Sequence, residues 1–339
     1  MQGQPAEKEP EQKSKTPLDE LSSVLDHDMR QVNARILKSM ESDVAIIPRL
    51  ARYLIAAGGK RIRPLLTLAC ASIYDASMEK VWPLAAAVEF IHTATLLHDD
   101  VVDESAERRG QKAANMIFGN KASVLVGDFL FSKSFQLMVE CRSVEILRIL
   151  SDAAAVIAQG EVKQLTTANN IETPLSAYID VIEAKTAALF AASCQIGPAL
   201  TEAGEQQEKA MRTYGMQIGI AFQIVDDMLD YAADPEKWGK DIGDDFREGK
   251  MTAPVIFALE NADEAEKSFW QRTIGNKIVS DGDFETALEL INRHNGLEKS
   301  RKLAQSQIKQ AKDSLLQVPE HPLRKTLDNL ADFVLVRAN

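Results

Sequence analysis

Apolar residues recur at intervals of three and four along almost the whole chain, beginning at about Leu18. The first such segment places its apolar side chains on one helical face: Leu21, Leu25, Met29, Val32 and Ile36. This spacing is typical of an amphipathic helix. It continues over 46–57, 62–75, 79–103, 121–140, 143–166, 175–201, 205–232 and 251–262, and with interruptions over 283–337. Clear alternating runs bounded by turns are absent from the sequence, so we expect few strands and an all-α fold.

A polar segment precedes the helical pattern. Residues 1–17 are rich in Pro, Gln and charged residues, which predicts a disordered tail. From residue 18 to residue 339 the composition does not shift, and no long linker interrupts the helices. The breaks between helices carry turn-forming residues, as in "AAGGK", "TTANNIETP" and "VPEHP". We therefore predict a single all-helical domain over 18–339, with its helices packed in layers.

The composition is that of a soluble globular protein, with 45% hydrophobic and 26% charged residues. A formal net charge of −11 argues against nucleic-acid binding, which needs a broad basic surface. No uninterrupted apolar run is long enough for a membrane span and the N-terminus lacks a secretory pattern, so we expect a cytoplasmic protein with at most peripheral membrane contact. The widely spaced Cys70, Cys141 and Cys194 predict reduced, buried thiols rather than disulfides or a zinc site.

Two apolar helical segments end in the same arrangement of aspartates, "LLHDDVVD" and "FQIVDDMLD". Asp99 and Asp103, four residues apart, share one helix face, as do Asp226 and Asp230. Carboxylates so placed repel one another, and Mg²⁺, which takes hard oxygen ligands, would compensate them. For either cluster alone the alternative is a solvated helix end, but the repetition favours a metal site. An EF-hand is disfavoured, because neither segment has alternating acidic ligands around a central Gly.

Basic residues follow each aspartate cluster and also stand near the start of the helical chain. They are Arg108 and Arg109 in "ESAERRGQ", Lys240 and Lys250 in "KWGKDIGDDFREGKMTAP", and Lys60, Arg61 and Arg63 in "GGKRIRP". Arg binds phosphate oxygens in bidentate fashion, and Lys adds a point charge. Any one of these segments is typical of an exposed loop. Together with two aspartate clusters, they indicate a site for a diphosphate.

Five segments, in this order, resemble the motifs of one family: "GGKRIRP", "DDVVDESAERRG", "KTAALF", "FQIVDDMLD" and "GKDIGDDFREGKMTAP", spanning residues 58 to 254. The family is that of the trans-isoprenyl diphosphate synthases, in particular the long-chain polyprenyl (octaprenyl, solanesyl or decaprenyl) type. The resemblance implies an all-α isoprenoid-synthase fold, a layered helical bundle whose Asp-rich helices face each other across a deep central cavity. It also implies a homodimer and a Mg²⁺-dependent, head-to-tail condensation of isopentenyl diphosphate with an allylic diphosphate, such as farnesyl or geranyl diphosphate.

The resemblance also implies a role for each motif residue. Mg²⁺ would be bound by Asp99, Asp103 and Asp226, supported by Asp100, Asp227 and Asp230. Isopentenyl diphosphate would be bound by Lys60, Arg63, His92 and Arg109. The allylic diphosphate would be bound by Arg108, Lys185, Lys240 and Lys250. Thr186 and Gln223 would lie near the cationic carbon, so that Lys185, Thr186 and Gln223 form the catalytic set.

The resemblance further implies that product length depends on the helical turn before Asp99. Ala94 and Thr95 are small there, whereas short-chain members of the family usually carry an aromatic residue at one of these positions. Phe129 or Phe131, on a facing helix, would close the channel lower down. This predicts a long polyprenyl product, of the kind used as a quinone side chain. The alternatives are that Ala94 is an ordinary packing residue and that the product is a shorter farnesyl or geranylgeranyl chain.

Two further functions remain as alternatives. A terpene cyclase shares the helical fold and an Asp-rich first motif, but "GGKRIRP" and a second complete DDxxD argue against it. A non-catalytic partner subunit of a related synthase typically loses one or both aspartate clusters, and this chain retains both. A helical scaffold without a ligand would leave the clustered Asp, Arg and Lys residues unexplained. The sequence therefore predicts a prenyltransferase.

Overall fold

The computed structural model describes residues 15–56, 59–108, 110–232 and 242–336. Most of the predicted tail lies outside these ranges, as do two predicted substrate-binding residues, Arg109 and Lys240. The first described helix, α1, begins at Pro17, one residue before the predicted domain. Thr16 caps it, because its hydroxyl accepts a hydrogen bond from the backbone N–H of Asp19 while the Asp19 carboxylate accepts one from the backbone N–H of Thr16.

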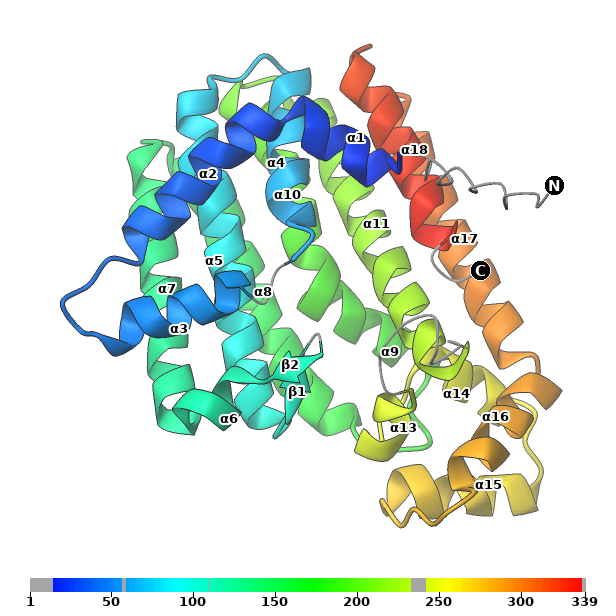
Figure 1. Ribbon diagram of the computed structural model, residues 1–339. Helices are drawn as coiled ribbons and strands as arrows, with labels where there is room; N and C mark the ends of the chain where they lie inside the picture. The colour runs from blue at the N-terminus through cyan, green and yellow to red at the C-terminus, as the bar shows by residue number, and fades with distance from the viewer. Residues whose placement is uncertain (1–14, 57–58, 109, 233–241, 337–339) are drawn as a thin grey trace, which may run out of the picture.

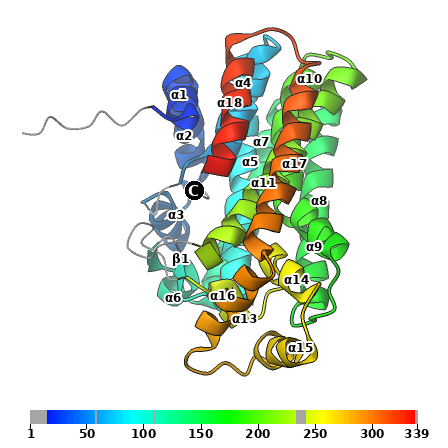
Figure 2. The same ribbon diagram turned by 90° about the vertical axis from the view of Figure 1, so that its right-hand side faces the viewer.

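Long helices standing side by side make up the body of the molecule (Figures 1 and 2). They are α4 (Ile62–Ile73), α5 (Met78–Val102), α7 (Asn120–Glu140), α8 (Val144–Thr167), α10 (Ala188–Leu200), α11 (Glu205–Ala232), α17 (Gly296–Leu315) and α18 (Pro322–Val336). The helices α1 (Pro17–Val24), α2 (Asp26–Ser39) and α3 (Ile46–Ala56) cross one side of this body. Shorter helices gather at one end: α9 (Leu175–Ile182), α13 (Asp244–Glu248), α14 (Ala253–Leu259), α15 (Glu264–Trp270) and α16 (Asp283–Arg293).

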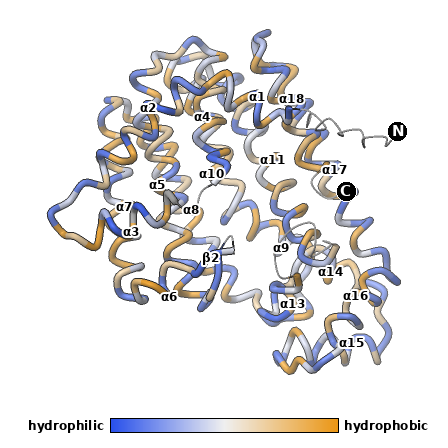
Figure 3. Tube along the Cα trace, in the orientation of Figure 1, coloured by the Kyte–Doolittle hydropathy of each residue, from blue (hydrophilic) through white to orange (hydrophobic). Residues whose placement is uncertain are grey.

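The helices form because apolar residues recur with helical spacing and are buried between neighbouring elements. Figure 3 shows hydrophobic and hydrophilic positions alternating around nearly every helix. Where two helices come closest, glycine permits the approach. A Cβ placed on Gly215 of α11 would lie 2.4 Å from the carbonyl oxygen of Phe190 on α10, and one on Gly219 would lie 2.6 Å from the Cα of Ala187. α10 and α11 thus pack backbone to backbone beside the aspartates of α11.

The predicted all-α fold is confirmed, and the predicted helices occur close to their expected bounds. Three short elements were not predicted: α6 (Ala114–Phe118), α13 and α15. In the described residues the strands are β1 (Glu107–Arg108) and β2 (Gln111–Lys112), which form an antiparallel hairpin around Gly110 at φ 71°. Two π-turns, η1 (Glu183–Ala187) and η2 (Gln271–Gly275), interrupt otherwise helical segments. Cys70, Cys141 and Cys194 are free and buried, as the sequence predicts.

Helix α7 differs from the sequence-based expectation in one respect. Over the described residues it is the helix that is long and apolar enough to span a membrane, although only 39% of its most apolar window is buried in the chain. The sequence indicated no such span because Asp128 and Lys133 interrupt the apolar run. α7 packs along α5 in the body of the molecule, and its outer face retains apolar side chains such as Leu125. An exposed apolar face of this kind is typical of an interface.

Candidate active site

The π-turn η1 lies between the two helices that carry the aspartate clusters. Lys185 of η1 places its Nζ 3.4 Å from Asp99 Oδ2 on α5. The next residue, Thr186, donates its hydroxyl hydrogen bond to Gln223 Oε1 on α11, at 2.8 Å. Two consecutive residues therefore bring α5 and α11 to one site. A π-turn inserts an extra residue into a helix and changes the direction of its side chains, and such turns are frequent at functional sites.

The first aspartate cluster holds like charges in a partly buried place. Burial raises the pKa of Asp99, Lys185 opposes that shift, and the charge of Asp103 adds to it. Burial also lowers the pKa of Lys185, but Asp99 and Glu161 outweigh it, so the pKa is raised and the ammonium stays charged. One lysine thus balances several neighbouring carboxylates, and the remaining negative charge favours a further cation.

Glu161 of α8 joins this cluster, and the sequence analysis did not predict it. Its Oε2 lies 2.7 Å from Lys185 Nζ, and its Oε1 is buried without a hydrogen-bond partner. The preceding Gly160 allows this contact, because a Cβ there would lie 2.7 Å from Ala184 Cβ and 2.9 Å from the backbone nitrogen of Lys185. The "GE" pair in "AQGEVKQL" is the only sequence signal, and its spacing does not point to the aspartates.

In the second cluster, Asp227 is buried and engaged on both oxygens. Its Oδ2 accepts a hydrogen bond from the Tyr178 hydroxyl at 2.6 Å, and its Oδ1 accepts one from Gln223 Nε2 at 2.7 Å. Burial raises the pKa of Asp227 to about 7, although both hydrogen bonds lower it. The contacts of Asp227 are therefore those of a residue that supports its neighbours rather than one that faces a ligand.

Asp230 is also occupied, in this case by backbone groups. Its two carboxylate oxygens accept hydrogen bonds from the backbone N–H groups of Asp244 and Asp245, at 3.2 and 3.0 Å. Its carbonyl oxygen accepts a third from the N–H of Gly243, at 3.0 Å. These N–H groups open α13, so Asp230 caps that short helix as an N-cap residue would. It thereby positions the segment that leads to Lys250.

Asp226 is half-buried one position before Asp227, and Lys250 lies within electrostatic range of both clusters. Burial lowers the pKa of Lys250, but Asp245 and Glu248, and more weakly Asp103, raise it above its usual value. The positive charge of Lys250 in turn lowers the pKa of Asp227. Lys250 is thus linked electrostatically to Asp103 of the first cluster and to Asp227 of the second.

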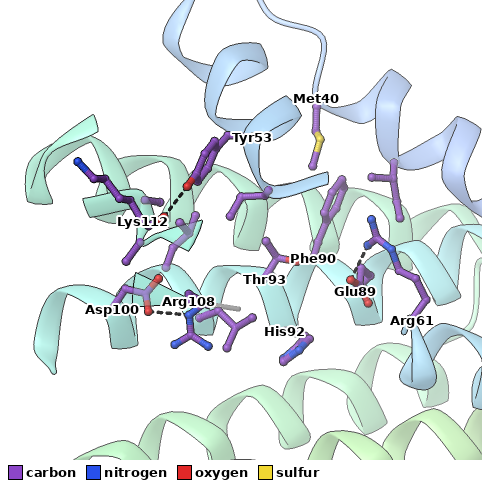
Figure 4. A pocket seen from close by; sticks show the side chains of 16 residues that line it. Met40, Tyr53, Arg61, Glu89, Phe90, His92, Thr93, Asp100, Arg108 and Lys112 are labelled. Atoms are coloured by element: carbon purple, nitrogen blue, oxygen red, sulfur yellow. Dashed lines mark hydrogen bonds and ion pairs between the residues drawn. The ribbon is translucent and has the colours of Figure 1, made fainter. Parts of the chain in front are cut away.

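Asp100 anchors the hairpin that carries the first arginine. Arg108 Nε donates a hydrogen bond of 2.7 Å to Asp100 Oδ1, and Asn115 Nδ2 donates one of 2.8 Å to the Asp100 carbonyl. Figure 4 shows the Asp100–Arg108 pair in a pocket bounded by α2, α3, α5, the hairpin and α6. The pocket shares His92, Asp100 and Arg108 with the predicted site, but not Asp99 or Asp226, so it adjoins the carboxylates and does not enclose them.

The residues predicted to bind isopentenyl diphosphate lie at the α4 side of the site. Arg63 places its guanidinium carbon 4.3 Å from the centre of the Phe190 ring on α10. His92 is half-buried on α5, two turns before Asp99, and lines the pocket of Figure 4. Lys60 is exposed just before α4 begins. The structure therefore places Arg63 against α10 and His92 on α5, whereas the substrate contacts of these residues and of Lys60 stay predictions from the motifs.

The two positions predicted to set product length differ in burial. Ala94 is 1% exposed and belongs to the hydrophobic core. Thr95 is half-buried, and its hydroxyl donates a hydrogen bond to the His92 carbonyl at 2.8 Å. Both lie on α5 in the turn before Asp99. Their effect on the product stays a prediction.

The carboxylates fit a hard cation that shares its ligands with a substrate. In the described ranges, no three Asp, Glu, His or Cys side chains are grouped closely enough to hold a metal ion by themselves. The predicted ligands nevertheless all offer carboxylate oxygens, from Asp99 near the end of α5, from Asp103 directly after that helix and from Asp226 on α11. Such an arrangement suits an ion that completes its shell with water and phosphate oxygens.

An all-helical fold in which Lys185 and Thr186 link the two aspartate-bearing helices is that of an isoprenoid-synthase type of protein. The chain belongs to the family described as "Polyprenyl synthetase", whose model matches residues 44–291. It is 41% identical to the octaprenyl diphosphate synthase of Escherichia coli over 320 residues, which covers 94% of this chain and 99% of that one. This match places the predicted motifs within a homologous chain of the same extent.

Two solved structures are similar over nearly their whole length. A decaprenyl diphosphate synthase from Rhodobacter capsulatus superposes with a TM-score of 0.91 at 50% identity, covering 95% of this chain and 100% of that one. A polyprenyl synthase from Caulobacter crescentus, complexed with calcium and isoprenyl diphosphate, has a TM-score of 0.91 at 46% identity, covering 96% and 100%. The family predicted from the motifs is therefore confirmed.

The contacts of Asp230 predict that its mutation differs in effect from that of Asp226. Asp226→Asn is expected to lower kcat for prenyl transfer roughly a hundredfold or more at unchanged melting temperature, because it removes a carboxylate that would hold Mg²⁺. Asp230→Asn is expected to raise KM for the allylic diphosphate and to lower the melting temperature, because it weakens the cap of α13. Steady-state kinetics and thermal melting of both variants test this, and equal kinetic effects would contradict the division of roles.

Proposed function

We propose that the protein is a prenyltransferase that condenses isopentenyl diphosphate onto an allylic diphosphate and so makes a long-chain polyprenyl diphosphate. The observation that carries this proposal is the contact of Lys185 and Thr186 with Asp99 on α5 and Gln223 on α11. It joins a cation, a hydroxyl and two carboxylate-bearing helices at one site. Membership of the family and the names of its relatives support the same reaction.

The allylic carbon–oxygen bond breaks first, and the diphosphate leaves with the bonding electrons. Lys185 and Lys250, both positively charged, stabilise the negative charge that grows on the diphosphate. Arg108, held to α5 by Asp100, adds a bidentate donor at the hairpin. These side chains favour ionisation because the charge they compensate is larger in the transition state than in the bound substrate.

Mg²⁺ fits this site, with Asp99, Asp103 and Asp226 as the residues that would hold it. When bound, it would neutralise the diphosphate oxygens and act as a Lewis acid on the leaving group. The excess of carboxylates over lysines around Asp99 supports this choice, as does a similar structure whose description includes calcium and isoprenyl diphosphate. Calcium and magnesium both prefer oxygen ligands.

The carbon side of the reaction requires acceptors of positive charge and a second diphosphate site. Thr186 and Gln223 present oxygens next to η1, where the allylic cation would form. Arg63 and His92, with Lys60, would hold isopentenyl diphosphate so that its double bond attacks that cation. The released diphosphate would then remove the proton, so the reaction needs no separate side-chain base.

The direct test incubates the purified chain with farnesyl diphosphate, isopentenyl diphosphate and Mg²⁺, and measures the chain length of the products. We expect elongation to an octaprenyl to decaprenyl product, and no reaction when isopentenyl diphosphate is omitted. A product formed without isopentenyl diphosphate would indicate a cyclase. No reaction from a well-folded sample would indicate the non-catalytic partner subunit and refute the proposal.

The long product is supported by the small side chains at Ala94 and Thr95, and the relatives reported above are an octaprenyl and a decaprenyl synthase. A product of this length has an extended hydrocarbon tail, which must pass along α5 away from the aspartates. We also propose that the product serves as a quinone side chain, as long polyprenyl chains do. The composition of the chain favours a cytoplasmic location. The transfer of such a product to a bilayer requires at most peripheral membrane contact.

Filling the turn before Asp99 is expected to shorten the product. Ala94→Phe and Thr95→Phe each place a ring in that turn, and at least one should stop elongation several isoprene units earlier, at a similar rate per addition. Thr93→Phe is the matched control, because Thr93 precedes Ala94 by one position and Thr95 by two. Its side chain therefore points roughly 100° and 200° around the helix from theirs, and it lines the pocket of Figure 4. Chromatography of the products tests this, and an unchanged length in both variants would exclude that turn as the floor.

The outer face of α7 and α8 supports a homodimer. These helices are joined by residues 141–143 and run in opposite directions (Figure 1), so the start of α7 and the end of α8 lie at the same end of the pair. Leu125 is 67% exposed there, and Val162 and Leu165 are each 65% exposed. Isolated apolar side chains are ordinary on a surface, but an apolar face along two adjacent helices indicates an interface. A second copy of the chain would cover it.

Replacing one of these apolar residues by a charge is expected to separate the dimer. The parent should have the mass of a dimer in light scattering, and Leu125→Asp should have that of a monomer, because an unpaired carboxylate would be buried between the subunits. Leu316→Asp is the control, since Leu316 is 72% exposed at the end of α17, away from this face. A monomeric parent, or equal masses for the parent and Leu125→Asp, would contradict the assignment of this face.

A further inference from the structure

A chain of hydrogen bonds runs from the buried end of α9 to the π-turn. Tyr178, 5% exposed, donates its hydroxyl to Asp227 Oδ2 at 2.6 Å. Asp227 Oδ1 accepts from Gln223 Nε2 at 2.7 Å, and Gln223 Oε1 accepts from the Thr186 hydroxyl at 2.8 Å. None of the sequence motifs includes Tyr178, which stands seven positions before Lys185.

The donors and acceptors along this chain have a fixed order: Tyr178 and Gln223 both donate to Asp227, and Thr186 donates to Gln223. Burial raises the pKa of the Tyr178 hydroxyl, and the neighbouring Asp227 raises it further. The phenol therefore stays protonated and acts as the hydrogen-bond donor to Asp227. The amide nitrogen of Gln223 can only donate, and it faces the carboxylate of Asp227. The amide oxygen of Gln223 must then face Thr186, and it can only accept. The proton of the Thr186 hydroxyl is therefore directed toward Gln223.

This direction matters for the chemistry of the proposed reaction. With its proton committed to Gln223, Thr186 turns the lone pairs of its oxygen toward the space beside η1. An oxygen lone pair stabilises a developing carbocation, whereas an O–H proton aimed at it would destabilise it. When Asp227 is ionised, the reverse orientation of the Gln223 amide would set its oxygen against the carboxylate, which is unfavourable in a buried place.

We propose that Tyr178 is a positioning residue for prenyl transfer, which acts through Asp227 and Gln223 to present the lone pairs of Thr186 to the reacting carbon. The inference rests on the proposed function. Tyr178 does not touch the substrate. Its hydroxyl fixes one oxygen of Asp227, so that the other oxygen stays aligned with the Gln223 amide. Its removal would free the carboxylate to rotate and would loosen the orientation of the amide.

The test is Tyr178→Phe, which removes only the hydroxyl. The single-turnover rate of the first condensation is expected to fall roughly tenfold, while the Kd for the allylic diphosphate changes less than about threefold, because the diphosphate contacts are intact. Tyr214→Phe is the matched control. Tyr214 is equally buried on α11, and its hydroxyl donates to the Leu327 carbonyl at 2.8 Å, remote from the site. Equal rates for Tyr178→Phe and Tyr214→Phe would overturn the inference.

A double-mutant cycle separates positioning from general loosening of the fold. If Tyr178 acts through Thr186, Tyr178→Phe should slow the parent but add little to Thr186→Val, which has no hydroxyl to orient. Full additivity of the two effects would refute the relay. If Tyr178→Phe fails to fold, Asp227→Asn takes its place in the same cycle, because an amide there cannot accept from both donors. A parent that does not elongate would refute the proposed function, which is a separate outcome.

Discussion

The site depends on holding several carboxylates together where water only partly screens them. Asp99, Asp103 and Glu161 surround the ammonium of Lys185, and their mutual repulsion is not fully balanced by it. Such an arrangement is unfavourable in the chain alone and becomes favourable when cations and a diphosphate complete it. Binding of cations and a diphosphate is thus favoured because it relieves the repulsion between these carboxylates. The layered helices supply the rigid frame that keeps these groups from relaxing apart.

The second cluster shows how the same motif divides its work among its members. Asp227 is held by Tyr178 and Gln223, and Asp230 caps α13. These contacts give Asp227 and Asp230 supporting roles, and Asp226 stays the predicted metal ligand of this motif. A motif of identical residues thus contains one candidate ligand and two supports. The local backbone decides which is which, since α13 reaches back to Asp230 and α9 reaches across to Asp227.

The sequence predicted the fold and the aspartates, because helical periodicity and the four-residue spacing of like charges are local patterns. It could not predict Tyr178 or Glu161, because their partners lie on other helices; Tyr178 and Asp227 are 49 positions apart. The π-turn η1 was missed for a different reason, since one inserted residue hardly changes the apolar period over 175–201. The short helix α13 carries too few apolar residues to show a period, and it forms because Asp230 caps it.

Gly160 allows α8 to lie in direct contact with the backbone of the π-turn η1. A methyl group at that position would meet the backbone of Lys185, so the distance between the two helices is set by the absence of a side chain. The ammonium of Lys185 forms ion pairs with both Glu161 and Asp99. An alanine there would therefore act as a wedge, moving the ammonium relative to the aspartates while every charged residue of the site remained present. The electrostatic balance around Lys185 therefore depends on the absence of a side chain at Gly160, a residue that carries no charge itself.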